Sequence, residues 1–119
     1  MQLRSFYADP SRILLTFDGD ATPVAVVALS IADQVGKVRR LYVDPNYRTS
    51  GLGRRLVEML INQATEMGLD LLVLNTLPTM VHAQALYRSL GFTETDPYVD
   101  NPTDGILYFQ RHLDKRHGA

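Results

Sequence analysis

The stretch of sequence that decides the fold reads Tyr47-Arg48-Thr49-Ser50-Gly51-Leu52-Gly53-Arg54-Arg55-Leu56. It follows an apolar run that ends at residues 43–45, and it opens a segment with the apolar spacing of a helix. We therefore expect a strand, a glycine-containing turn and a helix N-terminus in succession. The glycines allow a ligand to approach the backbone closely, and the first N–H groups of a helix have no partner inside it. With the helix dipole and the nearby arginines, this arrangement predicts an anion site, most often for phosphate.

Composition limits the chain to one ordinary domain. It has 119 residues, of which 45% are hydrophobic and 21% charged, which is enough for a single core and too few for two. We expect one domain over residues 1–119, with 1–12 as a remnant N-terminal segment and 114–119 as a flexible tail. The net charge of −1 provides no basic field for nucleic acid or an acidic membrane.

The chain also lacks the patterns that would direct it to a membrane or an oxidising compartment. It contains no cysteine, which excludes disulfides and thiol catalysis and fits a reducing cytoplasm. The N-terminus does not have the basic and apolar regions of a signal peptide. No apolar run approaches the roughly 20 residues of a membrane helix. We therefore expect a cytoplasmic protein with neither a membrane nor a nucleic acid as partner.

Three apolar runs near the start of the chain predict an antiparallel meander. Pro45 has no N–H for a strand ladder, so the third run should end near Asp44. In order, the runs and the turns between them are 13–17, Asp18-Gly19-Asp20, 23–31, Asp33-Gln34-Val35-Gly36 and 38–43.

Residues 52–67 form the clearest helical pattern, because one face is apolar and the other carries charged and polar side chains. Gly68 is placed to end this helix. The run 71–74 is apolar on both faces, as expected of a central buried strand, so the strand, helix and strand predict a parallel crossover. The apolar stripe of the helix consists of Leu52, Leu56, Val57, Leu60, Ile61 and Ala64.

A second helix is expected over residues 80–90, with Thr79 as its N-cap. Gly91 should end it, and Phe92 is placed for the hydrophobic contact of a Schellman motif. Residues 106–109 are expected to form a last strand. The complete pattern predicts an α/β protein with a mixed sheet and helices packed on it.

Two nucleotide-binding interpretations of the glycine turn are weak. A P-loop needs Lys-Ser/Thr after its last glycine, and Arg54-Arg55 stand there instead. A dinucleotide fingerprint needs a third glycine and an acidic residue at the end of the next strand, where this chain has Asn75. The dinucleotide alternative predicts NAD binding, which titration would detect.

The segment 43–56 closely resembles the acetyl-CoA motif of the GNAT N-acetyltransferases. The family's pattern Arg/Gln-x-x-Gly-x-Gly/Ala is matched by Arg48, Gly51 and Gly53. Residues 74–80 and 101–105 also resemble one bacterial branch of the family. The resemblance covers roughly residues 23–113 and implies a GNAT-like acyl-CoA N-acyltransferase fold. A second family motif follows at the expected distance in Ala85-Leu86-Tyr87-Arg88-Ser89-Leu90-Gly91-Phe92.

The resemblance implies acetyl-CoA as co-substrate, no metal, and a primary amine of a small molecule or protein as acceptor. The strands 38–43 and 71–75 would splay apart around the pantetheine arm, and one backbone N–H near Leu41 or Val43 would polarise the thioester. The turn 48–55 would hold the pyrophosphate, although Arg54 and Arg55 also fit solvated charges. The cofactor-binding residues implied are Leu41, Tyr42, Val43, Arg48, Thr49, Ser50, Gly51, Leu52, Gly53, Arg54 and Arg55.

By the same resemblance, Tyr87 is the general acid that protonates the departing thiolate in a direct transfer. The alternative role for Tyr87 is a buried aromatic. Many relatives carry an acid four residues before the residue that corresponds to Leu41, where this chain has Lys37. Acidic residues near strand ends are candidate bases, namely Asp33, Glu94 and Asp96. His82 has no second ligand at metal spacing and is expected at the surface.

The acceptor half looks shortened. Family members usually begin with a strand and two helices that wall the acceptor site, whereas residues 1–12 can form only one helical turn or an edge strand. We therefore expect a homodimer in which a neighbouring subunit fills the gap. The alternative function is a non-catalytic CoA-binding or interaction module that keeps the fold.

Overall fold

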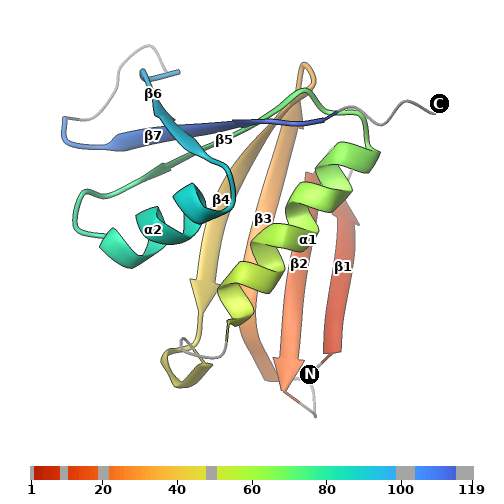
Figure 1. Ribbon diagram of the computed structural model, residues 1–119. Coiled ribbons are helices and arrows are strands. Elements are labelled where there is room, and N and C mark those ends of the chain that lie inside the picture. The colour runs from red at the N-terminus through yellow and green to blue at the C-terminus, as the bar shows by residue number, and fades with distance from the viewer. Residues whose placement is uncertain (1, 9–10, 19–21, 48–50, 99–103, 115–119) are drawn as a thin grey trace.

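The computed structural model describes residues 2–8, 11–18, 22–47, 51–98 and 104–114. Within them, two α-helices pack on one mixed seven-stranded sheet (Figure 1), which confirms the predicted class. The elements are β1 (Gln2–Ala8), β2 (Ser11–Asp18), β3 (Thr22–Ala32), β4 (Val35–Val43), the 3₁₀ turn η1 (Pro45–Tyr47), α1 (Leu52–Glu66), β5 (Leu71–Thr76), α2 (Val81–Ser89), β6 (Thr93–Thr95) and β7 (Leu107–His112). The strands lie in the order β1-β2-β3-β4-β5-β7-β6.

The predicted meander of β2, β3 and β4 is present and antiparallel throughout. The N-terminal segment adds an edge strand to it, because β1 pairs with β2 from Gln2 and Phe17 to Ala8 and Ser11. Only residues 9 and 10 separate β1 from β2, so no helix lies between these two strands. The first strand expected from the family is therefore present, and the two helices that usually follow it are not.

The turn between β3 and β4 is tighter than the sequence predicted. Asp33 and Gln34 alone form it, with φ of 51° and 65°, and β4 begins at Val35 rather than at residue 38. Gly36 is a buried strand residue and not part of the turn. A Cβ on Gly36 would lie 2.8 Å from both Leu29 Cδ1 and Leu72 Cδ2, so any larger residue there would have to displace these two buried side chains.

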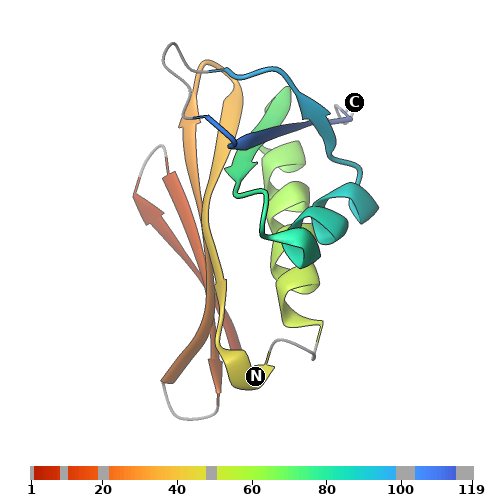
Figure 2. The same ribbon diagram turned by 90° about the vertical axis from the view of Figure 1, so that its left-hand side faces the viewer.

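The main core lies between the sheet and α1. All six residues of the predicted stripe on α1 are buried, which confirms that stripe. They pack against the buried side chains of β3 and β5, among them Val27, Leu29 and Leu72. Figure 2 shows α1 and α2 on the same side of the sheet, and no described helix lies on the other side of β1–β4.

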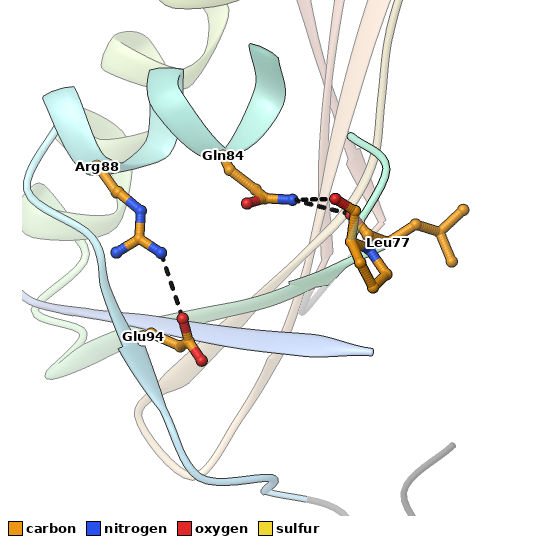
Figure 3. A network of polar contacts seen from close by, with 5 residues as sticks. Leu77, Gln84, Arg88 and Glu94 are labelled. Atoms are coloured by element: carbon orange, nitrogen blue, oxygen red, sulfur yellow. Dashed lines mark hydrogen bonds and ion pairs between the residues drawn. The ribbon is translucent and has the colours of Figure 1, made fainter. Parts of the chain in front are cut away.

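The helix α2 begins one residue later than predicted, at Val81, and the prediction of Thr79 as its N-cap is wrong. Met80 occupies the N-cap position and makes no side-chain cap. The Gln84 side chain instead donates hydrogen bonds to the carbonyls of Leu77 and Pro78, each 3.1 Å long (Figure 3). These bonds fix the turn before the helix, a task that a capping threonine would otherwise share.

The C-terminal end of α2 is the predicted Schellman motif. Gly91 has a φ of +94°. Its N–H bonds to the Arg88 carbonyl at 3.1 Å, and the Phe92 N–H bonds to the Tyr87 carbonyl at 3.0 Å. The Phe92 ring contacts the Tyr87 ring with centroids 5.8 Å apart, which is the hydrophobic contact of the motif.

The crossover from β4 through α1 to β5 is parallel, as predicted. The last strand, β7, starts at Leu107 and runs to His112, beyond the predicted end at residue 109. It lies antiparallel to β5 on one side and to the short strand β6 on the other. The sheet therefore continues past β5, which makes β4 and β5 central strands.

Candidate functional site

The central strands β4 and β5 separate partway along their length. They pair at three positions only, Val35 with Leu71, Gly36 with Leu72, and Lys37 with Val73. Beyond Lys37, β4 continues to Val43 beside β3, and β5 continues to Thr76 beside β7. Figure 1 shows the two strands running apart from this point. A wedge therefore opens in the middle of the sheet, at the place where splayed strands were expected.

A β-bulge bends β4 along the wedge. Val26 of β3 pairs with Tyr42, and Ala28 pairs with Arg39, so two steps along β3 oppose three steps along β4. The extra residue lies between Arg39 and Tyr42. A bulge leaves its extra residue outside the regular ladder and re-aims the neighbouring groups. Backbone groups of β4 near Leu41 thus face the wedge without a partner strand from β5.

A cavity of about 610 Å³ lies at the mouth of the wedge. It is enclosed by the end of β4, the first turn of α1 and the start of α2. Three large apolar side chains at its rim are unusually exposed: Tyr42 by 51%, Met80 by 49% and Val81 by 60%. Such grouped apolar exposure indicates a binding surface. The lining residues are Leu41, Tyr42, Val43, Gly51, Gly53, Arg54, Thr79, Met80, Val81, His82, Ala83 and Leu86.

The first turn of α1 brings an anion site to this cavity. Gly51 is the N-cap with φ +79°, and no side chain caps the helix. The first turn also carries no acidic residue, so its N–H groups and the positive end of the helix dipole face the cavity without a negative charge. A Cβ on Gly53 would lie 3.5 Å from Val43 Cγ2 and 3.8 Å from Leu86 Cδ2, so any side chain there would extend into the cavity.

The arginines at the start of α1 differ in their surroundings. The Arg54 guanidinium donates a hydrogen bond of 2.5 Å to the Ser89 hydroxyl, which itself donates to the Leu86 carbonyl at 2.7 Å. This chain of bonds ties Arg54 to α2 beside the cavity. Arg55 is exposed and outside the lining.

The remaining predicted cofactor residues are placed as follows. Leu52 is 4% exposed and belongs to the core, so only its backbone is available to a ligand. Arg48, Thr49 and Ser50 lie outside the described residues. Of the residues predicted in the described segments, the fold brings Leu41, Tyr42, Val43, Gly51, Gly53 and Arg54 to one cavity.

Tyr87 lies in the core beneath α2. Its side chain is 7% exposed, and its ring contacts Phe92 and Phe109 with centroid separations of 5.8 and 6.4 Å. Burial raises the pKa of the Tyr87 phenol above its usual value of 10.0, so the group is protonated at neutral pH. Tyr87 is not among the described residues that line the cavity.

The acidic candidates do not reach the cavity either. Glu94 accepts a hydrogen bond from Arg88 at 3.2 Å, in an exposed ion pair that links α2 to β6 (Figure 3). Asp96 lines a separate hollow of about 390 Å³ together with Glu94 and Thr95. Asp33 lies in the turn between β3 and β4. None of the three lines the main cavity.

The sequence patterns do not indicate the contribution of α2 to the cavity. Residues 79–83 line it, including His82, which was expected only as a surface residue. The available signal was Met80-Val81, two apolar residues at a helix start that do not share the buried side of α2. Among the described residues, no three His, Asp or Glu side chains gather as metal ligands would. In the same segments, no helix is long and apolar enough to cross a bilayer.

A family model described as the acetyltransferase (GNAT) family matches residues 2–92. The chain belongs to this family. It is 35% identical over 112 residues to an uncharacterized N-acetyltransferase of Schizosaccharomyces pombe, covering 92% of this chain and 69% of that one. It is 39% identical over 71 residues to the ribosomal protein bS18-alanine N-acetyltransferase of Escherichia coli, covering 55% of this chain and 48% of that one. This GNAT chain thus spans about half of the Escherichia coli relative.

The fold of this GNAT protein also matches solved structures. The PaiA N-acetyltransferase of Thermoplasma acidophilum, in complex with coenzyme A, superposes with a TM-score of 0.74. The two are 19% identical, and the match covers 85% of this chain and 60% of the other. At this identity the likeness concerns the fold alone. It agrees with the mixed α/β fold found here.

Proposed function

We propose that this GNAT protein transfers the acetyl group of acetyl-CoA directly to a primary amine. The observation that carries the proposal is the cavity beside the wedge, which joins a helix N-terminus to an apolar groove. Coenzyme A presents a pyrophosphate followed by a largely apolar pantetheine arm, so its two parts match the two parts of the cavity. The family assignment supports the same chemistry.

The pyrophosphate binds at the first turn of α1 in this proposal. The N–H groups around Gly51 and Gly53 donate to its oxygens, and the guanidinium of Arg54 supplies positive charge. The bond from Arg54 to Ser89 supports this role, because it holds the guanidinium beside the cavity before the ligand arrives. Pantetheine then lies along β4 from Val43 toward the bulge near Leu41, where a backbone N–H polarises the thioester carbonyl.

The chemical step is attack of a neutral amine on the thioester carbon. The C–N bond forms, the C–S bond breaks, and the CoA thiolate takes a proton. Tyr87 is our candidate for the proton donor, because a phenol needs no pKa shift to be protonated at neutral pH, and burial raises the pKa of this one further. Its place outside the cavity lining requires that the thiolate reach it through the wedge.

The acceptor class is a small amine or a protein amine. The relative from Escherichia coli is named for an alanine of ribosomal protein bS18, which supports keeping protein amines in this class. We also propose that the chain acts as a homodimer. The supporting observation is the side of β1–β4 that no described helix covers, where a second subunit would wall the acceptor site.

A non-catalytic CoA-binding module is the second candidate. Two observations favour it over the enzyme: Lys37 stands where many relatives carry an acid, and Asp33, Glu94 and Asp96 lie outside the main cavity. Such a module would bind acetyl-CoA and release no CoA from it in the presence of amines.

Release of free CoA thiol from acetyl-CoA over a panel of primary amines separates the two candidates. The enzyme is expected to release CoA with at least one amine. Tyr87→Phe keeps the ring contacts with Phe92 and Phe109 and removes only the hydroxyl, so kcat should fall by about 10²–10⁴-fold, the usual contribution of a general acid. The shift in melting temperature with acetyl-CoA should survive this substitution. Full activity in Tyr87→Phe would remove Tyr87 from the mechanism.

A further inference from the structure

The side of the sheet that faces away from both helices carries a polar cluster at the wedge. Along β4, Gly36 and Val38 are buried toward the helices. Lys37 and Arg39 alternate with them and therefore point to the opposite side. Lys37 is half-buried and belongs to the last pair before β4 and β5 separate, and Arg39 is exposed just beyond it. Two positive charges thus stand at the edge of the wedge.

The strands β5 and β7 complete the cluster from the other edge. Asn75 of β5 pairs with Tyr108 of β7 and lies two residues past Val73, the last residue that pairs with β4, on the same side of the sheet as Val73. The chain after β6 crosses to the helix-free side (Figure 2), and there Tyr98 packs edge-on against Tyr108 with centroids 5.1 Å apart. The Asn75 side-chain amide donates a hydrogen bond of 3.4 Å to the Tyr98 hydroxyl.

Lys37 and Tyr98 join the two halves across the wedge. The Lys37 ammonium lies 5.5 Å from the centroid of the Tyr98 ring, within the range of a cation–π interaction. Burial raises the pKa of the Tyr98 hydroxyl, and the hydrogen bond from Asn75 and the charge of Arg39 lower it in part. Within the described part of the chain, neither Lys37 nor Arg39 forms an ion pair with a carboxylate. No carboxylate of the described residues therefore pairs with these two cations where they meet the gap in the sheet.

We propose that the cluster of Lys37, Arg39, Asn75 and Tyr98 binds an anionic group, a carboxylate or a phosphate, on the amine acceptor. This inference rests on the proposed acetyl transfer, because the acceptor must approach the thioester from the side of the wedge that CoA does not occupy. The two cations bind the anion, and the Asn75 and Tyr98 side chains offer neutral hydrogen bonds next to it. A polycationic acceptor is disfavoured by the same charges.

Two matched pairs of amines test the inference by release of CoA. β-Alanine and β-alaninamide differ in a carboxylate against a neutral amide, and O-phosphoethanolamine and ethanolamine differ in a phosphate. The anionic member should have a kcat/KM about tenfold or more above that of its neutral partner, as expected for a charge-assisted hydrogen bond. The pair with the larger ratio identifies the anion.

Substitutions within the cluster test whether it causes the preference for anionic amines. Lys37→Gln and Arg39→Gln should each raise KM for the anionic amine about tenfold and leave the neutral amine unchanged. Arg88→Gln is the matched control, because it removes one positive charge from the side of α2 that carries the exposed ion pair with Glu94. It should leave both members of a pair unchanged. Equal loss for the anionic and the neutral amine in Lys37→Gln would overturn the inference.

Failure of the inference is distinguishable from failure of the proposed function. Equal kcat/KM within both pairs overturns the anion site and leaves acetyl transfer standing. Absence of CoA release with every amine overturns the transfer, and calorimetric titration of the CoA-loaded protein then decides the inference. Binding of β-alanine or O-phosphoethanolamine that exceeds binding of the neutral partner, and that is lost in Lys37→Gln, supports it. Equal or undetectable binding of all four amines overturns it.

Discussion

Lys37 of β4 and Val73 of β5 are the last paired residues of a parallel ladder that stops partway along both strands. The strands separate beyond this pair because β4 stays with β3 through a bulge and β5 stays with β7. The main cavity opens at the far end of β4, and the charged cluster lies beside Lys37 on the helix-free side. The end of this ladder therefore sets the positions of both the cavity and the charged cluster of the proposed site.

Acetyl-CoA should stabilise the protein, and Gly51→Glu should abolish this effect. At a concentration 100 times its Kd, a ligand adds about 2.7 kcal/mol to the free energy of unfolding. For a domain of this size, that raises Tm by roughly 10 °C. A glutamate at Gly51 places negative charge where the pyrophosphate is expected. Differential scanning fluorimetry with and without acetyl-CoA measures the shift.

Gly68→Glu is the matched control for this experiment. Gly68 ends α1 with φ +78°, against +79° for Gly51, and neither glycine has an atom within 4 Å of an added Cβ. Both substitutions therefore strain the backbone equally, by about 1–2 kcal/mol, and add the same charge. Only Gly51→Glu should lose the shift with acetyl-CoA. A shift retained in Gly51→Glu, or lost in both variants, would place the cofactor elsewhere.

Gly53→Ala and Gly53→Leu should separate stability from binding. An alanine methyl at this position has ordinary contacts, 3.5 Å to Val43 and 3.8 Å to Leu86, and replaces a helical glycine. Gly53→Ala should therefore raise the free energy of unfolding by roughly 0.5 kcal/mol. A leucine side chain would extend into the cavity, obstruct the ligand and raise the Kd of acetyl-CoA at least tenfold. Denaturant unfolding and calorimetric titration measure the two effects, and unchanged binding in Gly53→Leu would contradict the cavity assignment.

Gly36→Ala should destabilise the fold, unlike Gly53→Ala. Its Cβ would meet Leu29 Cδ1 and Leu72 Cδ2 at 2.8 Å in the closed core between β3, β4 and β5. Overpacking of this kind costs about 1–3 kcal/mol. Urea unfolding of the two alanine variants gives a direct comparison. Equal stability of Gly36→Ala and the unsubstituted chain would show that β4 can move away from its neighbours.

Stability should fall above pH 10 in part because of Tyr87. Burial raises the pKa of this phenol in the folded chain above 10.0, whereas the unfolded chain loses the proton near 10.0. The stabilisation is therefore complete below pH 10 and is lost as the pH rises toward the folded pKa. Tyr87→Phe should reduce the alkaline loss of unfolding free energy measured between pH 8 and 11. Tyr42→Phe, which alters an exposed ring, is the control, and identical slopes in both variants would refute the assignment.

Local sequence patterns predicted the elements that neighbouring residues determine. The stripe on α1 follows from helical spacing, and its six residues are all buried. The Schellman end of α2 follows from Gly91 and Phe92, which lie within one turn of the groups they bind. The meander follows from apolar runs that turn residues separate. In each case the partners are close in sequence, so the pattern itself carries the information.

Patterns failed where a partner lies on another element. The turn before α2 is fixed by Gln84, whose side chain reaches back to Leu77 and Pro78, so Thr79 is not needed as a cap. Gly36 lies in β4 rather than in the turn, and the side chains of Leu29 in β3 and Leu72 in β5 pack directly against it. The contacts around Gly36 are not visible in a window of sequence around it, whereas Gln84 lies only five residues from Thr79 and competes with it for the same turn.

The sequence by itself determined the family, the meander, the parallel crossover through α1 and the helix N-terminus at Gly51. Only the tertiary structure decided that β4 and β5 part after Lys37 and Val73, that the start of α2 lines the cavity, and that Tyr87 is buried outside this lining. The physical reason is that each of these facts depends on strand pairing: beyond Lys37 and Val73, β4 pairs only with β3, and β5 pairs only with β7. These pairings join strands far apart in the chain, and no local periodicity encodes them.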